Sequence, residues 1–323
     1  MSEAKVFSID HGNRFIKSEN HHFPASFVES DYLPSIGSDT LIYEGNEYTL
    51  DDQQVPQKND KTKDESYFIL TLFAIGKEII TDMDILADAT PEGIINVKLL
   101  AGLPPLHCKE MGPKYKEYFT KGNSIISFEI NKVPITIKIV DVYVYPQAYA
   151  AALTAHEKVE DSRIINVIDI GGYTVDCLQL TDFRVNLSKC TSLYNGVNVL
   201  FQKINEQVKA KMAREIPYIV IEGILQSDEK IVNSRSEERI QIVRANAERF
   251  TRDILSKVSN AGFDLEENPT IFVGGGSMLL SEYIKNSAMV TKPIIVDNIR
   301  ANVDGYQMMY SAQNQAHQEA PGA

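Results

Sequence analysis

The chain has few cysteines, and its basic residues are outnumbered by acidic ones. Its three cysteines, Cys108, Cys177 and Cys190, are odd in number and lack CxxC spacing. Such a set predicts neither a disulfide framework nor a zinc site, so we expect reduced thiols in a cytoplasmic protein. Lys plus Arg number 32 against 44 Asp plus Glu, which gives a net charge of −12. A surface this acidic repels phosphate backbones, so direct, non-specific binding to nucleic acid is not expected.

Long apolar runs and a leader layout are also missing. No stretch of 18 apolar residues occurs, and Met1–Lys5 passes directly into a strand-like run. These features predict no membrane partner and a cytoplasmic location. What is present is ordinary for a folded protein, with 43% hydrophobic and 24% charged residues over 323 positions. That length is enough for two domains, each with its own core.

One pattern of elements occurs twice along the chain. Strands Val6–Ile9 and Phe15–Lys17 flank an Asp-x-Gly-Asn turn, and near residue 169 strands again flank an Asp-x-Gly-Gly turn. Further strands and then a helix follow each turn, with the helices expected over Gln147–Lys158 and Gly196–Arg214. Two similar α/β halves, each with an acidic turn, predict a ligand cleft between related domains.

The repeat and the changes in composition suggest where the domains begin and end. A polar, proline-containing stretch interrupts the first half, and it is interpreted as a small variable subdomain with a hairpin over Leu41–Leu50 and a solvated loop over Lys58–Glu65. The expected organisation is domain I over 1–158 plus a C-terminal helix over 300–313, an inserted subdomain over about 20–92, domain II over 159–299, and a disordered polar tail over 314–323.

The two turns have the chemistry of phosphate sites. Small residues leave backbone N–H groups exposed, and such groups bind anions. Asp10 and Asp169 stand beside the turns, and magnesium suits such positions because it takes few carboxylates and keeps several of its waters. The sequence contains no GxxxxGK[ST], so a P-loop is excluded. The candidate phosphate contacts are Gly12, Asn13, Lys17, Gly171, Gly172 and Thr174.

Two further features complete the candidate site. Gly274, Gly275 and Gly276 lie between a predicted strand and a predicted helix, where glycines let a flat ligand approach the backbone. Gln147 carries both a donor and an acceptor at the expected start of a helix, which suits the orientation of an attacking water. An amide cannot take a proton, so positioning is favoured over general-base catalysis.

These motifs resemble those of the actin, chaperone and sugar-kinase superfamily of ATPases, and most of all those of the ParM (StbA) class of plasmid-segregation actins. Two departures from the class are visible: Asn13 stands where Ser or Thr is common, and Gln147 follows eukaryotic actin, whereas ParM carries Glu. The matching motifs run nearly end to end: Asp10-x-Gly12 with Lys17, Ala101 to Pro104, Tyr145 to Ala148, Ile168 to Asp176, Val273 to Gly276, and Asn302 to Tyr306.

The resemblance implies an α/β, actin-like (ribonuclease H-like) fold. Two similar domains, each with a mixed five-stranded sheet plus helices and smaller inserted subdomains, would surround a nucleotide cleft. The implied cofactors are ATP, or GTP, and Mg²⁺. The implied roles are magnesium binding through water by Asp10 and Asp169, orientation of the attacking water by Asp169 and Gln147, phosphate contacts from Gly12, Asn13, Lys17, Gly171, Gly172 and Thr174, and nucleotide contacts from Gly274, Gly275 and Gly276.

The resemblance also implies a function. An ATPase of this class polymerises into filaments and segregates plasmid DNA through a DNA-binding adaptor on a centromere-like site. A head-to-tail contact does not close on itself and therefore gives a filament. The alternative is a non-polymerising ATPase of the same fold, either a small-molecule kinase or a chaperone-like protein. A division or shape actin is less favoured, because no amphipathic membrane helix is visible at either end.

Several other residues have simpler interpretations. His21 and His22 are expected to be a solvated surface pair, and Tyr143, Tyr145 and Tyr149 to serve packing. The alternative that His11 touches a phosphate stays open.

Overall fold

The computed structural model describes residues 3–29, 37–51, 60–88, 93–233 and 235–319. They form two compact units, unit 1 comprising Met1–Ala151 with Asn302–Ala323 and unit 2 comprising Ala152–Ala301. The boundaries expected from the sequence, 158/159 and 299/300, differ from these by a few residues. Lys58 and Asn59 of the charged run and residues 320–323 of the expected tail lie outside the described residues.

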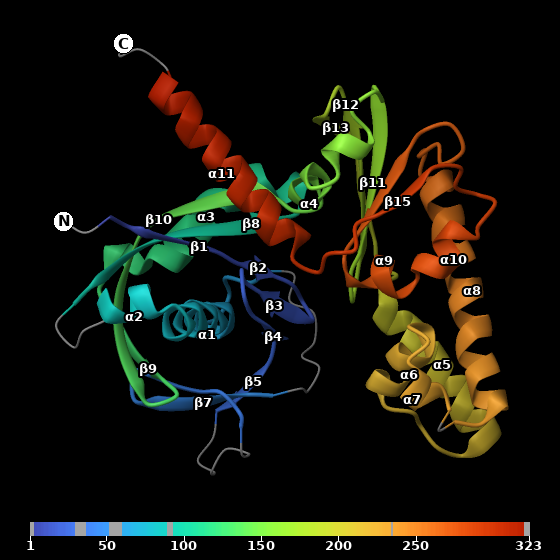
Figure 1. Ribbon diagram of the computed structural model, residues 1–323, viewed down its shortest axis with the longest axis horizontal. Helices are drawn as coiled ribbons and strands as arrows, with labels where there is room; N and C mark the ends of the chain where they lie inside the picture. Colours follow the sequence, from blue (N-terminus) through green and yellow to red (C-terminus); the bar gives the residue numbers. More distant parts are fainter. Residues whose placement is uncertain (1–2, 30–36, 52–59, 89–92, 234, 320–323) are drawn as a thin grey trace. The chain divides into compact units, whose positions relative to one another are not determined.

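Unit 1 contains a mixed sheet of seven strands that curls around helix α1 (Ser66–Thr81) (Figure 1). Strand β8, next to the edge strand β1, is parallel to both neighbours, β1 and β10, and the remaining pairs are antiparallel. In spatial order the strands are β1 (Lys5–Ser8), β8 (Ile95–Leu103), β10 (Val133–Pro146), β9 (Ile126–Ile130), β6 (Thr40–Tyr43), β7 (Asn46–Leu50) and β5 (Phe27–Glu29).

A second, three-stranded sheet continues from the first strand. It consists of β2 (Asp10–His11), β3 (Phe15–Lys17) and β4 (His22–Pro24). Only Ile9 separates β1 from β2, and its N–H donates to Leu100 O at 2.8 Å. Unit 1 thus differs from the expected five-stranded sheet, because the sheet divides at Ile9 and β6 adds to the edge of β9. In the described part of region 20–92, strands β5, β6 and β7 belong to this sheet and α1 belongs to its core.

Helix α1 is the element that the sequence analysis missed. Nearly all its residues from Tyr67 to Ile79 are buried, on every side of the helix. A helix that is apolar all round belongs inside a core, and it lacks the one-sided periodicity by which amphipathic helices are recognised. A short helix, α2 (Met83–Asp88), follows it.

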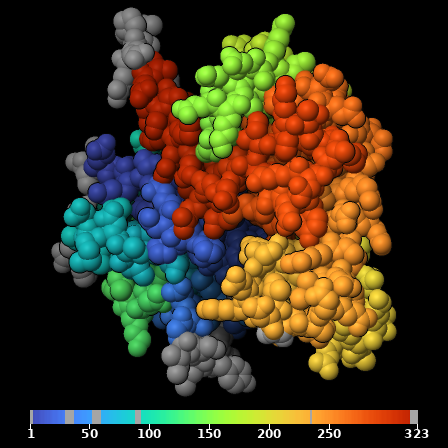
Figure 2. All heavy atoms as spheres, turned by 45° about the vertical axis from the view of Figure 1, so that its right-hand side comes forward, coloured from blue at the N-terminus to red at the C-terminus, as the bar shows by residue number. Residues whose placement is uncertain are grey.

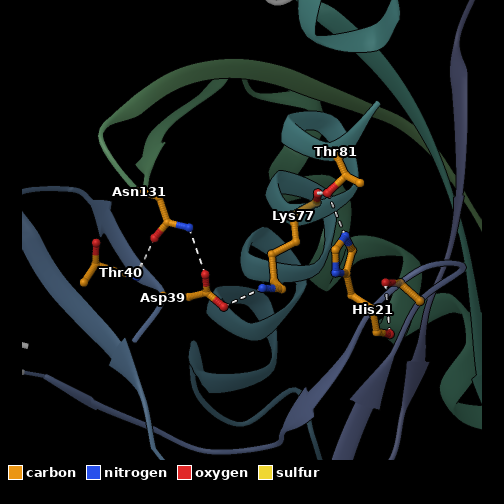
Figure 3. Close-up of polar contacts among 7 residues, drawn as sticks. His21, Asp39, Thr40, Lys77, Thr81 and Asn131 are labelled. Carbon is orange, nitrogen blue, oxygen red and sulfur yellow. Dashed lines mark hydrogen bonds and ion pairs between the residues drawn. The ribbon is translucent and has the colours of Figure 1, made fainter. Parts of the chain in front are cut away.

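Polar contacts fix the C-terminal half of α1 to the surrounding strands (Figure 3). Lys77 forms an ion pair with Asp39, whose other oxygen accepts a hydrogen bond from Asn131 Nδ2 at 2.8 Å. His21 Nε2 lies 2.9 Å from Thr81 Oγ1, so the histidine expected to be solvated contacts the helix. These bonds orient α1, while its apolar side chains supply the burial.

The remaining helices of unit 1 lie after β8 and at the C-terminus. Pro146 ends β10, so the helix expected from Gln147 begins at Tyr149. Helix α11 continues to Glu319, further than the predicted 313, and no Gly or Pro interrupts it from Gln307 to that point. These elements are η1 (Pro105–His107), α3 (Cys108–Thr120), η2 (Lys121–Asn123), α4 (Tyr149–Leu153) and α11 (Ala301–Glu319).

Unit 2 contains the expected mixed sheet of five strands. In spatial order they are β13 (Arg184–Leu193), β12 (Val175–Thr181), β11 (Ile164–Ile170), β14 (Thr270–Val273) and β15 (Pro293–Ile295). The helix predicted over Gly196–Arg214 is α5 (Val197–Met212), and its apolar face packs into one core with α8 (Glu237–Asn260), β11 and β14, which confirms that prediction. In the space-filling view the yellow to orange helical segments of this unit form a continuous surface (Figure 2). The helices are α5 (Val197–Met212), α6 (Tyr218–Leu225), α7 (Glu229–Val232), α8 (Glu237–Asn260), α9 (Gly275–Leu279), α10 (Ser281–Lys285) and the short η3 (His156–Lys158).

None of the helices in the described part of the chain combines the length and the apolar character needed to cross a membrane.

Candidate functional site

The first candidate turn, residues 10–17 (turn 1), brings three predicted site residues together. Asp10 and Lys17 are paired across the β2–β3 hairpin, and Lys17 Nζ lies 3.2 Å from Asp10 Oδ2. Gln147 Nε2 donates to Asp10 Oδ1 at 2.9 Å. Gln147 is held by its own N–H, which donates to Leu103 O at 2.8 Å, just beyond the end of β10. Asp10 therefore lies in a strand at the edge of the turn, with both carboxylate oxygens engaged.

The Asp10 carboxylate is buried and charged. Only 2% of the residue is exposed. Burial raises its pKa, but the charge and hydrogen bond of Lys17, together with the charge of Lys61, outweigh that effect, and the pKa is lowered from its ordinary value. The neighbouring ammonium groups thus keep this buried carboxylate negatively charged.

Gly12 and Asn13 form the tip of turn 1. A Cβ on Gly12 would lie 2.5 Å from Phe15 O, so only glycine fits the turn without a shift of backbone. Asn13 Oδ1 accepts a hydrogen bond from the Tyr67 hydroxyl at 3.2 Å, which ties the tip to α1.

His11 belongs to the core of unit 1. Its ring is fully buried, stacks on Phe119 with centroids 5.0 Å apart, and places Nε2 2.7 Å from Thr71 Oγ1. The Thr71 hydroxyl already donates to Tyr67 O, so Nε2 is the donor. Burial, and then the charge of Lys61, lower the pKa of His11 to about 3, so the ring is neutral at pH 7. A fully buried neutral ring does not suit a phosphate contact.

The second candidate turn, residues 169–176 (turn 2), is closed mainly by its backbone. Asp169 lies in β11, and the Gly171 N–H donates to Thr174 O at 2.9 Å. Thr174 Oγ1 donates to Asp176 Oδ2 at 3.0 Å. Gly171 and Gly172 direct their carbonyls at the start of α5, where the N–H groups of Val197 and Asn198 donate to them at 3.0 and 2.9 Å.

Glycines surround turn 2 because other backbone lies in contact with it. A Cβ on Gly196 would lie 2.4 Å from the Gly172 carbonyl and the Tyr173 nitrogen. Gly274 has φ +85°, and a Cβ there would lie 2.2 Å from Asp169 Oδ1. A Cβ on Gly276 would lie 2.5 Å from Ile170 Cγ2, whereas Gly275 has nothing within 4 Å. The structure thus places the glycine triplet against the strand that carries Asp169.

Helix α9 begins within the glycine triplet, which was expected to lie before the helix. Gly274 is its N-cap, and the helix begins at Gly275. Ser277 lies inside the helix and donates from Oγ to Val273 O at 2.6 Å.

The sequence analysis missed three residues that touch the two turns. Lys61 donates from Nζ to the backbone carbonyl of His11. The buried side-chain amide of Asn198, in the first turn of α5, has no hydrogen-bond partner among the described residues. Gly196 precedes α5, where glycine at an N-cap position is a usable sequence signal. The neighbouring sequence does not indicate the contact of Lys61, because that contact links segments far apart in the chain.

A magnesium ion fits the chemistry of the predicted carboxylates. Within the described residues, no three His, Cys, Asp or Glu side chains gather into a metal site. Magnesium does not need such a cage, since one or two carboxylates, phosphate oxygens and water satisfy it. Both oxygens of Asp10 are already bonded to Lys17 and Gln147, which favours contact with an ion through water.

Comparisons with known proteins identify the fold. Residues 167–286 match a family model described as the C-terminal part of archaeal MreB-like actin homologues. Among curated protein sequences no significant match is found.

Many solved structures are similar to the chain over almost its whole length. The archaeal actin homologue Ta0583 is 15% identical with a TM-score of 0.73, covering 95% of this chain and 99% of its own. The apo ParM protein of pSK41 is 16% identical with a TM-score of 0.69, covering 98% and 100%. The Alp12 filament structure is 18% identical with a TM-score of 0.66, covering 97% and 100%. The chain therefore has the actin-like fold, and residues 167–286 in its second unit are similar to the C-terminal part of archaeal MreB-like actin homologues.

Proposed function

We propose that the chain is a cytoplasmic, actin-like ATPase that binds ATP and magnesium and polymerises into filaments. In this proposal the filament segregates plasmid DNA through a DNA-binding adaptor on a centromere-like site. The observation that carries the proposal is the pair of turns, each with a buried or half-buried Asp beside glycines, in an actin-like fold. Two of the similar structures add support, because one structure of Ta0583 is a complex with ADP and the Alp12 structure is a filament.

The roles of turn 1 follow from its contacts. Lys17 holds Asp10 ionised, and Gln147 orients that carboxylate through Oδ1. Gly12 keeps side-chain atoms out of the turn, so backbone N–H groups can approach phosphate oxygens. Asp10 and Asp169 would hold magnesium through water, and the ion would neutralise phosphate charge when bound.

The roles of turn 2 depend on its backbone. The bonds from α5 fix Gly171 and Gly172, so the turn is rigid before any ligand arrives. Gly274 and Gly276 leave room beside the strand that carries Asp169, since a Cβ on Gly274 would lie 2.2 Å from Asp169 Oδ1. Asp169 and Gln147 would orient the attacking water, with Gln147 acting by position because its amide takes no proton.

The test is right-angle light scattering with parallel measurement of phosphate release, after addition of Mg-ATP, Mg-GTP or buffer. We expect scattering to rise with nucleotide and then to decay as phosphate is released. Steady phosphate release with flat scattering would instead favour a non-polymerising kinase or chaperone-like ATPase. If neither nucleotide produced a rise in scattering or any release of phosphate, that result would contradict the proposal.

Asp169→Ala separates assembly from hydrolysis. Loss of the carboxylate should slow phosphate release while the scattering rise persists and its decay is delayed. Asp182→Ala is the matched control, because Asp182 lies in the exposed β12–β13 turn of the same sheet. An Asp169→Ala protein that hydrolyses at the rate of the parent would exclude the assigned role.

A further inference from the structure

The charged run before α1 is a folded strap that lies against turn 1. Residues 60–65, called the strap here, are the described part of the run that the sequence analysis interpreted as a solvated loop. Its side chains make bonds in two directions, toward α3 on one side and toward turn 1 on the other. Such a segment has a defined position relative to the turn, which a solvated loop would lack.

Contacts with α3 fix the strap independently of turn 1. Asp60 accepts hydrogen bonds from Lys114 Nζ at 2.6 Å and from the Thr62 N–H at 2.9 Å. The Tyr118 hydroxyl donates to Asp64 O at 2.7 Å and accepts from the Phe68 N–H at 2.8 Å. These anchors do not involve Lys61, so substitution of Lys61 should leave the strap in place.

Lys61 directs its ammonium group at turn 1. Nζ donates to the carbonyl of His11, the residue that precedes Gly12. The same nitrogen lies 5.0 Å from the centroid of the Tyr67 ring, a cation–π contact, and the Tyr67 hydroxyl bonds Asn13 at the tip of the turn. The ammonium group is therefore held beside the backbone of turn 1 from two sides.

The Asp10–Lys17 pair of turn 1 offers no net positive charge to a phosphate group, so a further cation beside it would strengthen phosphate binding. Lys17 is the phosphate-binding cation that the motif suggests, yet it is paired with buried Asp10, so together they contribute no net charge. A triphosphate brings several negative charges. An ammonium group has three N–H donors, so a bond to the His11 carbonyl is compatible with a second bond to a phosphate oxygen. The charge of Lys61 also reaches the carboxylate, since it helps to lower the pKa of Asp10.

We propose that Lys61 is a second phosphate-binding cation of turn 1, which contacts the terminal phosphates of a bound nucleoside triphosphate beside Lys17. This inference rests on the proposed nucleotide binding and goes beyond it, because it assigns a binding residue outside the recognised motifs. It predicts that Lys61 contributes to affinity according to the number of phosphates on the ligand.

The test compares affinities for ATP, ADP and AMP by titration calorimetry in wild type, Lys61→Met and Lys61→Arg. Loss of one charge-assisted hydrogen bond should weaken ATP binding by about tenfold in Lys61→Met. AMP affinity should change little, and Lys61→Arg should recover most of the ATP affinity. Lys63→Met is the matched control, because Lys63 lies in the same strap with an exposed side chain.

The outcomes separate this inference from the proposed function. Wild-type protein that binds neither ATP nor tripolyphosphate would contradict both. Wild-type binding of ATP with unchanged affinity in Lys61→Met would overturn only the role of Lys61. Equal losses of affinity for ATP and for AMP would show that Lys61 has a structural role. Thermal unfolding of the ligand-free variants would then show a loss of stability as well. If Lys61→Met fails to fold, Lys61→Gln keeps a polar contact to the carbonyl and gives the same comparison.

Discussion

Turn 1 and turn 2 share an Asp-x-Gly sequence but are held by different forces. Turn 1 is stabilised by side chains, because Asp10 is bonded to Lys17 and Gln147. Turn 2 is stabilised by backbone hydrogen bonds, because the carbonyls of Gly171 and Gly172 accept bonds from N–H groups at the start of α5. The same short motif therefore specifies a turn without specifying what stabilises it.

The difference predicts how each turn responds to change. A turn held by buried charge depends on the balance of charges around it, since a buried carboxylate without a partner is costly. A turn held by close backbone contacts depends on volume, since atoms cannot be added where backbone already lies. Charge changes should therefore act mainly at turn 1. Added methyl groups should act at turn 2 and, within turn 1, at Gly12, where a Cβ would lie 2.5 Å from Phe15 O.

The largest effect is expected from Gly196→Ala, at the start of α5 beside turn 2. The new Cβ would lie 2.4 Å from three backbone atoms of Gly172 and Tyr173, which cannot move aside as a flexible side chain can. We expect a loss of about 3 kcal/mol in the free energy of unfolding, the upper range for overpacking. Urea unfolding measures it. Gly275→Ala is the control, because that Cβ meets nothing within 4 Å, and equal losses in the two variants would contradict the account of turn 2.

The next effect is expected from Lys17→Met in turn 1. Asp10 would keep Gln147 but lose the ammonium group 3.2 Å away, and the cost of its buried charge should be about 2 kcal/mol of unfolding free energy. Asp10→Asn removes that charge, so the double variant should be less destabilised than the sum of the two single variants. Additive losses would mean that the pair does not stabilise turn 1.

Patterns local in sequence predicted much of the fold. The hairpin at turn 1 and the apolar face of α5 are confirmed, as is the five-stranded sheet of unit 2 that the resemblance implied. Helix α1 was missed because burial on all sides removes the periodic signal. Strand β10 is continuous from Val133 to Pro146, with an irregularity in its pairing between Ile139 and Asp141 that would look like a strand break in the sequence.

The candidate site was predictable in its motifs and not in its contacts. Asp10 and Gln147 were each singled out by local sequence, but their hydrogen bond joins residues far apart in the chain. Lys61 could not be found in this way, because its position depends on how the strap packs against α3. A run of mixed charges directly before the apolar stretch from Tyr67 is the only trace of this arrangement in the sequence.

A smaller effect is expected from Tyr67→Phe, which tests the tip of turn 1. The substitution keeps the ring beside Lys61 and removes only the hydroxyl that donates to Asn13 at 3.2 Å. We expect a loss of about 1 kcal/mol in the free energy of unfolding, typical of one hydrogen bond. Chemical unfolding of Tyr67→Phe and Asn13→Ala measures it. The two variants should lose similar amounts, and a much larger loss in Tyr67→Phe would assign another role to the hydroxyl.

The smallest effect is expected from Asp39→Asn, which asks whether charge matters throughout unit 1 or mainly at turn 1. Burial raises the pKa of Asp39, but hydrogen bonds from Lys77 and Asn131 lower it more, so the pKa lies below its ordinary value of 3.8 (Figure 3). The stabilisation is therefore present above about pH 4 and is lost as pH falls further, because the unfolded chain takes up the proton first.

Both members of this pair are partly exposed, with 16% and 27% of the side chains of Lys77 and Asp39 accessible. Solvent screening should limit the loss at pH 7 to about 0.5 kcal/mol of unfolding free energy. Urea unfolding of wild type and Asp39→Asn from pH 7 to pH 3 should show this difference shrinking toward zero, and Lys77→Met should behave alike. A loss as large as that of Lys17→Met would mean that ion pairs stabilise unit 1 wherever they occur. The contrast between the two turns would then reflect the composition of the units, and not the way in which each turn is built.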